Sequence, residues 1–331
     1  MIALVTGGGG FLGRTLVESL LARGDRVRVV ARGRYPALEA LGAETFRVDL
    51  SRGGPELDTA LEGCEIVHHV AACTDVWGAR AKLWAANVTA TDHLLEAMRR
   101  QGTRKLVFTS SPSVTFDGGD AEGVSEAEAS YPAHHLSPYP ETKAEAERRV
   151  LAAHGHDLKV CALRPHLIWG PRDPHLFPRV IERARKGRLR RVGDGTNRVA
   201  LTHVRHAAEA QILAGDALDR PDGPGGKAYF ITDGEPVNLW GFIDRLLVGV
   251  GLEPLRASVG ANTAYRVGSV LETLWGTLRL PGEPPMSRFV ARQLSTSHWY
   301  DISAAERDFG YRPHVDLEAA LEETLVQLRG S

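Results

Sequence analysis

Cysteine is scarce in this chain of 331 residues, and its scarcity excludes two kinds of protein. The three cysteines, Cys64, Cys73 and Cys161, are odd in number, far apart and not spaced as zinc ligands. A secreted fold held by disulfides would need paired cysteines, and a structural zinc site would need closely spaced ones. The sequence therefore predicts no metal site and indicates a reducing, cytoplasmic compartment.

Long apolar runs and an excess of one charge are also lacking. No uninterrupted apolar stretch has the length that a bilayer requires, and Met1 is followed directly by the apolar run 2–5 without the pattern of a signal peptide. The 40 basic and 41 acidic residues nearly cancel, which argues against broad binding to nucleic acid. We therefore expect a small-molecule partner, no nucleic acid, and at most a peripheral membrane contact.

Short β-branched runs alternate with amphipathic helical stretches through the first half of the chain. Such alternation forms a parallel sheet covered by helices on both faces, so the predicted fold class is α/β with a Rossmann-type doubly wound sheet. The expected strands are 2–6, 26–31, 45–48, 66–70, 105–109 and 159–163, and the expected helices are 11–23, 55–62, 81–101 and 139–153.

After residue 165 the alternation loosens, and proline and glycine cluster in several places. We interpret this part as a smaller, mainly C-terminal substrate-binding domain, packed over the carboxyl edge of the sheet where open α/β folds bind ligands. The predicted division assigns 1–169 to the Rossmann domain, with 199–235 returning to it. The substrate-binding domain would comprise 170–198 and 236–331.

A glycine-rich loop follows the first expected strand and opens the first expected helix. Gly7, Gly10 and Gly13 would give the tight turn, let a pyrophosphate approach backbone N–H groups, and let helix and strand pack closely. An ordinary tight turn is the alternative, but the strand–loop–helix context favours a dinucleotide site. The predicted cofactor contacts are these three glycines with Phe11, Leu12 and, after the fourth strand, Ala71.

Arg32 follows the second strand, where an NAD site usually has a carboxylate. Ala31 leaves room there, and a guanidinium can bind a 2′-phosphate with paired charged hydrogen bonds. We therefore predict NADP(H); the alternative is that Arg32 and Arg34 are solvated surface charges. Asp49-Leu50 ends the third strand and would contact the adenine, with capping of the next turn as the other interpretation.

Tyr139 and Lys143 are four residues apart, on one face of an expected helix. A free tyrosine has a pKa of about 10 and is a poor proton donor or acceptor near neutrality. A nearby ammonium group and an oxidised nicotinamide would stabilise the phenolate and lower this pKa. The spacing alone occurs by chance in helices. Ser111, at the end of an upstream strand, adds a hydroxyl that can bond a substrate carbonyl.

The glycine loop, the strand-end serine and the Tyr/Lys pair, in this order, resemble the extended short-chain dehydrogenase/reductase superfamily over most of the chain. By this resemblance Tyr139 is the acid/base and Lys143 binds the nicotinamide ribose and tunes the tyrosine. Ser111 would orient the carbonyl, with Ser113 as the other candidate. Asn87 would fix a water or a helix kink in the proton path; the alternative is a solvated helix residue.

Within the superfamily the likeness is greatest to the 3β-hydroxysteroid dehydrogenase branch, and there to the bacterial 2-alkyl-3-oxoalkanoate reductases of olefin biosynthesis. It rests on residues 32–38, 227–231, 282–285, 298–300 and 309–311. The resemblance implies NADP(H)-dependent reduction of a lipophilic 2-alkyl-3-oxoalkanoate to the 3-hydroxy acid.

Three other functions stay open as alternatives. A 3β-hydroxysteroid or sterol dehydrogenase is the second choice. A nucleotide-sugar epimerase is the third, disfavoured because Val199 replaces the arginine that would bind the nucleotide phosphate. A non-catalytic NADP-binding sensor would typically lack the Tyr/Lys pair.

Three further predictions concern the roles of two segments and the oligomeric state of the protein. The segment 179–191 has seven basic residues and one acid, and we interpret it as a solvated face rather than an anion site. The stretch 263–280 has the apolar spacing of a helix, which is either a core helix or an apolar lid over a lipophilic pocket, with a possible membrane contact; we favour the lid or pocket wall. A homodimer is predicted to pack the helices 81–101 and 139–153 against their mates, through Leu83, Trp84, Val88, Leu94, Ala144, Ala146, Val150 and Leu151.

Overall fold

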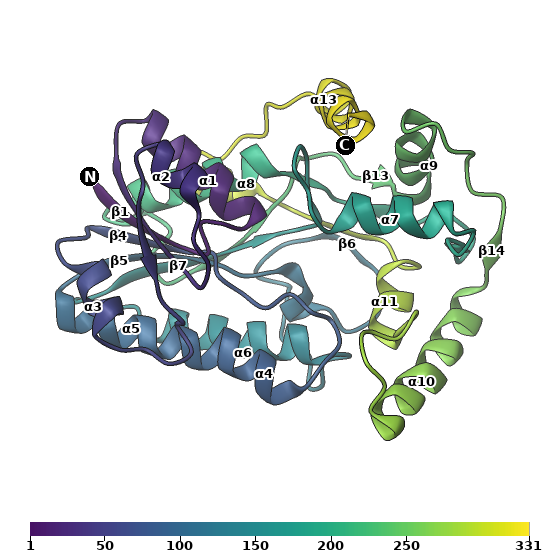
Figure 1. Cartoon of the computed structure of the whole chain (residues 1–331), viewed down its shortest axis with the longest axis horizontal. Helices are drawn as coiled ribbons and strands as arrows, with labels where there is room; N and C mark the ends of the chain where they lie inside the picture. Colours follow the sequence, from purple (N-terminus) through teal and green to yellow (C-terminus); the bar gives the residue numbers. More distant parts are fainter. Residues whose placement is uncertain (331) are drawn as a thin grey trace.

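The computed structural model describes residues 1–330, and a seven-stranded parallel sheet runs through its centre (Figure 1). The predicted α/β fold is confirmed. The chain passes from β1 through β2 to β3 at one edge, then returns to β4 and proceeds to the other edge. In spatial order the strands are β12 (Ala228–Ile231), β7 (Lys159–Pro165), β5 (Lys105–Thr109), β4 (Ile66–His69), β1 (Ile2–Thr6), β2 (Arg26–Ala31) and β3 (Glu44–Arg47).

The register brings the carboxyl ends of the central strands together. Thr6 pairs with Val30 on one side and with His69 on the other, and Thr109 pairs with Leu163. The order of the strands reverses between β1 and β4, and open α/β sheets bind ligands in the crevice at such a point. The loops that follow these strands therefore share one edge.

Helices cover both faces of the sheet (Figure 1). The helices of one set are α1 (Phe11–Ala22), α2 (Pro36–Ala40), α8 (Val204–Ala217) and α12 (Ser303–Phe309). The helices of the other set are α3 (Pro55–Leu61), α4 (Arg80–Trp84), α5 (Ala90–Gln101) and α6 (Pro138–Ala152). One apolar core lies under α1, α8 and α12, and a second apolar core lies under α3, α5 and α6.

The helix expected over 81–101 is not continuous. Between α4 and α5 the chain forms a π-helical turn, η1 (Ala85–Thr89). A π turn inserts one extra residue, and such turns occur often at functional sites. The apolar spacing on either side still fits a helix, so the pattern gave no sign of the interruption.

The remaining segments build a smaller part at the right of Figure 1, with its own apolar core. It contains α7 (Leu176–Arg185), α9 (Leu239–Gly249), α10 (Ala261–Leu278), α11 (Arg288–Gln293) and α13 (Leu317–Arg329). A four-stranded sheet has the order β13 (Val237–Asn238), β10 (Arg198–Val199), β15 (His298–Tyr300) and β6 (Ala121–Val124). Two further pairs are β11 (Thr202–His203) with β8 (Ile168–Trp169), and β14 (Ser258–Val259) with β9 (Arg191–Val192). A 3₁₀ turn, η2 (Pro112–Thr115), follows β5.

Candidate active site

The glycine loop joins β1 to α1 where the strand order reverses. Gly7 has a left-handed φ of +68°, and a Cβ added there would lie 2.8 Å from the Cα of Ala71. A Cβ on Gly13 would lie 2.2 Å from the carbonyl oxygen of Gly7. Gly10 is the N-cap of α1, so the first backbone N–H groups of α1 have no capping side chain from that position. The loop is therefore a cradle of backbone donors that side chains would fill, as a bound pyrophosphate requires.

The two residues after this cradle have different exposures. Phe11 is half-buried, whereas Leu12 packs into the core between α1 and the sheet. Leu12 can therefore offer a ligand its backbone N–H but not its side chain.

The end of β2 places a cation beside the glycine loop. Ala31 is the last residue of β2, and Arg32 is exposed directly after it. The Arg32 carbonyl accepts a hydrogen bond of 3.2 Å from Nε of Arg47. The ring of Tyr35 lies against Gly9, where an added Cβ would be 2.1 Å from Cε1. Tyr35 therefore holds the turn that carries Arg32 against the loop.

Asp49 caps the turn after β3, as one of the two sequence interpretations stated. Its Oδ1 accepts from the backbone N–H of Ser51 at 3.1 Å and from the Ser51 hydroxyl at 2.7 Å. The Ser51 side-chain hydrogen bond lowers the pKa of Asp49, and the charge of Arg32 contributes in the same direction. Leu50 is buried, and its carbonyl accepts from Nδ1 of His93 at 2.9 Å. Asp49 is thus held in its charged form just after β3.

A chain of buried hydrogen bonds runs from the end of β1, just before the glycine loop, towards α6, the helix that carries Tyr139 and Lys143. The Thr6 hydroxyl contacts Nδ1 of His69 at 2.7 Å, and Nε2 of His69 contacts the Thr91 hydroxyl at 3.0 Å. The Thr91 hydroxyl donates to the carbonyl of Asn87 at 2.6 Å. Burial lowers the pKa of His69 to about 3, so the ring is neutral. Because the Thr91 hydroxyl gives its own proton to Asn87, it accepts a hydrogen bond from Nε2 of His69. Sequence reasoning missed this link because its members are far apart in the chain.

Asn87 lies in the π-helical turn and is buried, which excludes the interpretation as a solvated helix residue. Its Oδ1 accepts from the backbone N–H of Cys73 at 2.7 Å, and its Nδ2 donates to the Cys73 carbonyl at 3.1 Å. Nδ2 also donates to the Thr142 hydroxyl at 3.0 Å. Thr142 lies between Tyr139 and Lys143 on α6. Asn87 therefore joins the loop after β4 to α6, the helix that carries the predicted catalytic pair.

The hydroxyls of Ser111 and Tyr139 come together at the sheet edge. Ser111 caps η2, because its Oγ accepts from the backbone N–H of Ser113 at 3.2 Å, and the two serine hydroxyls are 2.9 Å apart. Burial raises the pKa of Tyr139, and a hydrogen bond from Ser111 opposes this. A substrate carbonyl oxygen placed against this pair could accept two hydrogen bonds.

Lys143 differs from the sequence expectation in what its ammonium contacts. Its Nζ donates to the Thr109 carbonyl at 2.6 Å and lies 4.0 Å from the centre of the Phe108 ring. Burial raises the pKa of Tyr139, so the lowering expected from lysine and nicotinamide together stays a prediction. Burial also lowers the pKa of Lys143, from its ordinary value of 10.5 to about 7.

A stability measurement can test the burial of Lys143. Between pH 7 and about 10 the unfolded chain binds this proton more tightly than the folded chain, so folding stability rises with pH in this window. Lys143→Met keeps an unbranched apolar side chain and removes the charge. We expect the variant to be more stable than the unaltered protein at pH 7 in urea unfolding, with a difference that shrinks towards pH 10. A difference that does not change with pH would contradict a lowered lysine pKa.

Sequence reasoning missed a buried ion pair one helical turn after Lys143. Nη2 and Nε of Arg164 donate to the two carboxylate oxygens of Glu147 at 2.6 and 3.0 Å, and the Tyr131 hydroxyl donates to Oε1 at 2.6 Å. The side chains of Glu147 and Arg164 are 0% and 5% exposed. Burial works to raise the pKa of Glu147, but the charge and hydrogen bonds of Arg164 outweigh it and the pKa is lowered. The only signal in the sequence was an acid four residues after Lys143.

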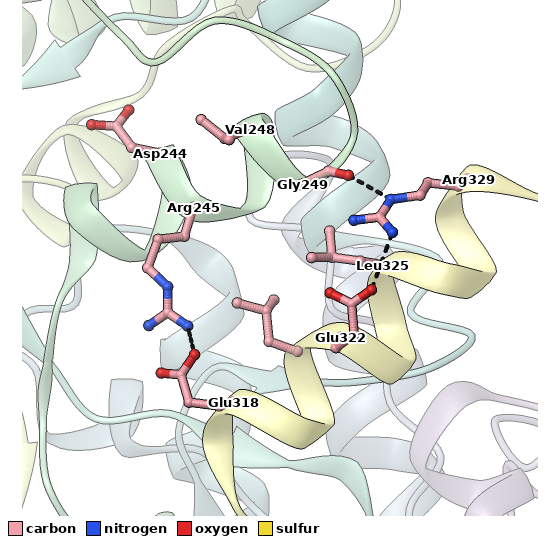
Figure 2. A pocket seen from close by; sticks show the side chains of 9 residues that line it. Asp244, Arg245, Val248, Gly249, Glu318, Glu322, Leu325 and Arg329 are labelled. Atoms are coloured by element: carbon pink, nitrogen blue, oxygen red, sulfur yellow. Dashed lines mark hydrogen bonds and ion pairs between the residues drawn. The ribbon is translucent and has the colours of Figure 1, made fainter.

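Two grooves lie away from this edge. One, of roughly 400 Å³, separates α9 from α13, and its walls are joined by the ion pair Arg245–Glu318 and by the hydrogen bond from Nε of Arg329 to the Gly249 carbonyl (Figure 2). The other, of roughly 610 Å³, lies between α1, α8 and α13 and the turn at 171–172. Neither is lined by a predicted site residue.

Among residues 1–330 no three His, Cys, Asp or Glu side chains are grouped as metal ligands would be.

The geometry defines a class of enzyme, and comparison with known proteins gives the family. A glycine loop, a strand-end serine and a Tyr/Lys pair on one parallel sheet define an oxidoreductase of the short-chain dehydrogenase/reductase type. The profile of the 3-beta hydroxysteroid dehydrogenase/isomerase family matches residues 4–259, and the chain belongs to this family. It therefore interconverts a ketone and an alcohol.

Curated relatives match the chain over nearly its whole length. The chain is 46% identical over 322 residues to a 2-alkyl-3-oxoalkanoate reductase of Stenotrophomonas maltophilia, covering 97% of each chain. It is 34% identical to the decarboxylating sterol-4-alpha-carboxylate 3-dehydrogenase of Mus musculus, covering 97% of this chain and 89% of that one. Both are named as enzymes that act on an oxygen-bearing carbon.

Solved structures share the fold. MoeE5 in complex with UDP-glucose and NAD is 28% identical, with a TM-score of 0.75 over 100% of this chain and 99% of that chain. The structure of gox2253 is 26% identical, with a TM-score of 0.78 over 99% and 98% of the two chains.

In the part of the chain that the structure describes, no helix has the length and apolar character to cross a membrane.

Proposed function

We propose that the chain is an NADP(H)-dependent reductase that converts a 2-alkyl-3-oxoalkanoate into the 3-hydroxy acid. The observation that carries the proposal is the bond from Lys143 to the Thr109 carbonyl, which ties the helix of Tyr139 and Lys143 to the strand end before Ser111, at the edge that also holds the glycine cradle. The substrate class comes from the relative that is 46% identical along 97% of both chains. An alternative sterol substrate has support from the more distant relative at 34% identity.

The residues of the site have distinct roles in this reaction. Bound NADPH would supply a hydride to the carbonyl carbon. Ser111 and Tyr139 hold the carbonyl oxygen, and Tyr139 donates its proton as negative charge develops there. Lys143 would exchange its bond to the Thr109 carbonyl for the ribose hydroxyls and place a positive charge beside the phenol. Asn87 fixes the position of α6 relative to the π-helical turn through its hydrogen bond to Thr142.

The residues around the glycine loop fit the proposed cofactor. Gly7, Gly10 and Gly13, with the backbone of Phe11 and Leu12, would hold the pyrophosphate, and Ala71 closes the loop from the opposite side. Arg32 would bind the 2′-phosphate because it is exposed at the end of β2 beside a small residue. Asp49 and Leu50 would line the adenine pocket.

Exchange of two residues at the end of β2 should reverse the cofactor preference. In the double variant Ala31→Asp/Arg32→Ala, the new carboxylate would repel a 2′-phosphate and accept from a 2′-hydroxyl. We expect kcat/KM for NADPH to fall and that for NADH to rise. Arg26→Ala is the matched control, because it removes an exposed cation at the opposite end of β2, away from the ribose position. If the unaltered protein uses both cofactors equally well, the proposed role of Arg32 is wrong.

The substrate is tested by following NADPH oxidation with 2-alkyl-3-keto acids, 3-ketosteroids and UDP-sugars. We expect the first group to give the highest kcat/KM. Turnover of ketosteroids alone would contradict the proposed substrate and favour the sterol alternative. An epimerase oxidises no NADPH overall, so conversion of a UDP-sugar into its epimer without loss of NADPH would favour the epimerase alternative.

A homodimer remains part of the proposal, although its support is narrower than the sequence suggested. Six of the eight apolar side chains expected at the interface are buried within the chain itself, and only Trp84 and Leu151 are partly exposed. Trp84 lies 4.8 Å from the guanidinium of Arg80 and 5.8 Å from that of Arg149. We expect light scattering to give twice the mass of one 36.0 kDa chain; the mass of one chain would contradict the dimer.

A further inference from the structure

Helix α10 presents an apolar stripe that no part of the described chain covers. Among residues 1–330, nine large apolar side chains are exposed, and five of them lie within 267–280. Val267, Val270, Leu274 and Leu278 are spaced by three or four residues, so they share one face of the helix, and their exposed fractions range from 44% to 62%. A concentrated apolar patch of this kind marks an interaction surface rather than ordinary scatter.

The opposite face of α10 is firmly packed, so the stripe is held in a fixed place. Gly268 is buried, and a Cβ there would lie 2.7 Å from the carbonyl carbon of Ser287. Glu272 accepts from the backbone N–H of Arg288 at 2.8 Å and from its Nε at 2.5 Å. These contacts fix α10 to α11 by its inner face, and in Figure 1 α10 lies at the outer edge of the molecule with α11 on its inner side.

Cationic residues accompany the stripe at both of its ends. The basic segment 179–191 is joined to the chain before α10 by pairing of β9 with β14, and to the chain after α10 by the contact between Arg179 and Glu283 at 3.5 Å. Five guanidinium groups of the basic segment and of α10 are exposed and form no ion pair with a described residue, namely Arg185, Arg188, Arg190, Arg266 and Arg279.

We propose that α10 docks on the surface of a bilayer that contains anionic lipids. The exposed stripe enters the boundary between headgroups and acyl chains, and the basic segment meets the lipid phosphates, which is the arrangement of interfacial amphipathic helices. Uncompensated positive charge beside the stripe favours an anionic lipid surface over a second copy of this chain, because two copies joined there would bring their arginines together. This surface extends the proposed function and does not depend on it.

Sedimentation of the full-length protein with vesicles tests the proposal. We expect binding to phosphatidylcholine vesicles that contain phosphatidylglycerol, weaker binding to phosphatidylcholine alone, and loss of binding as salt is raised. Leu274→Glu should weaken binding about tenfold or more, the scale expected for loss of one buried leucine. Thr273→Glu is the matched control: it adds the same charge at the adjacent exposed position, outside the stripe, and should bind nearly as the unaltered protein does.

Three results would overturn the proposal. The unaltered protein could stay in the supernatant with anionic vesicles. The two variants could lose binding equally, in which case charge alone and not the stripe decides it. Leu274→Glu could convert an oligomer into single chains while no form binds vesicles, in which case a second copy covers the stripe. Turnover of both variants with a water-soluble ketone substrate, equal to that of the unaltered protein, establishes that they are folded.

Discussion

Replacing Tyr139 by phenylalanine should reduce turnover by about 10²–10⁴-fold, the usual contribution of a general acid or base. The variant keeps the ring and loses only the hydroxyl that would donate the proton. NADPH affinity should change little, because the proposed pyrophosphate and 2′-phosphate contacts come from the glycine loop and Arg32. Single-turnover kinetics and fluorescence titration with NADPH separate the two effects.

Tyr229→Phe is the matched control for this substitution. Tyr229 is buried, and its hydroxyl donates to Asp308 at 2.6 Å, on the side of the sheet covered by α12. Its loss should leave turnover close to that of the unaltered protein. Near-normal turnover in Tyr139→Phe would remove Tyr139 from the mechanism, whereas an equal fall in both variants would indicate damage to the fold.

Breaking the buried ion pair beside the catalytic helix should cause the largest loss of stability. Arg164→Met removes the partner of the fully buried Glu147 carboxylate, and an unpaired buried charge typically costs about 3–5 kcal/mol. The double variant Glu147→Leu/Arg164→Met leaves no charge and should recover most of this loss. Urea unfolding at neutral pH measures both variants.

The response of this pair to acid has a definite sign. The pKa of Glu147 is lower in the folded than in the unfolded state, so the pair stabilises the fold above the unfolded pKa, and this contribution is lost as pH falls through the folded value. The double variant should therefore lose less stability on acidification than the unaltered protein. Arg100→Met is the control: it breaks an exposed pair with Asp58 and should cost less than about 1 kcal/mol. Equal costs for Arg164→Met and Arg100→Met would contradict the importance of burial.

Features set by neighbouring residues were predictable from the sequence. The strands β1, β2 and β5 have the expected bounds, because short β-branched runs flanked by turn residues leave little choice of period. The glycine loop was equally predictable, since the conformation of Gly7 and the close contact at Gly13 arise within one strand–loop–helix unit.

Features that depend on distant partners were not predictable. The π-helical turn is coupled to Asn87, whose partners Cys73 and Thr142 come from two other elements. The bond from Lys143 to the Thr109 carbonyl and the pairing of Glu147 with Arg164 likewise depend on packing of α6 against the sheet. The apolar side chains expected at the dimer interface were misjudged for the same reason, because six of the eight are buried within the chain itself.

The position of β15 also determines the order in which the protein can mature during synthesis. Ser297 donates its backbone N–H to Asp120, a residue 177 positions earlier, and β15 then lies between β10 and β6 in the small sheet. The apolar core under α1 also includes residues of α12. Both the glycine-loop side of the sheet and the segment after Ser111 therefore wait for residues near 300, because contacts between such distant residues form late. A nascent chain that ends before β15 should neither bind the dinucleotide firmly nor turn over a substrate.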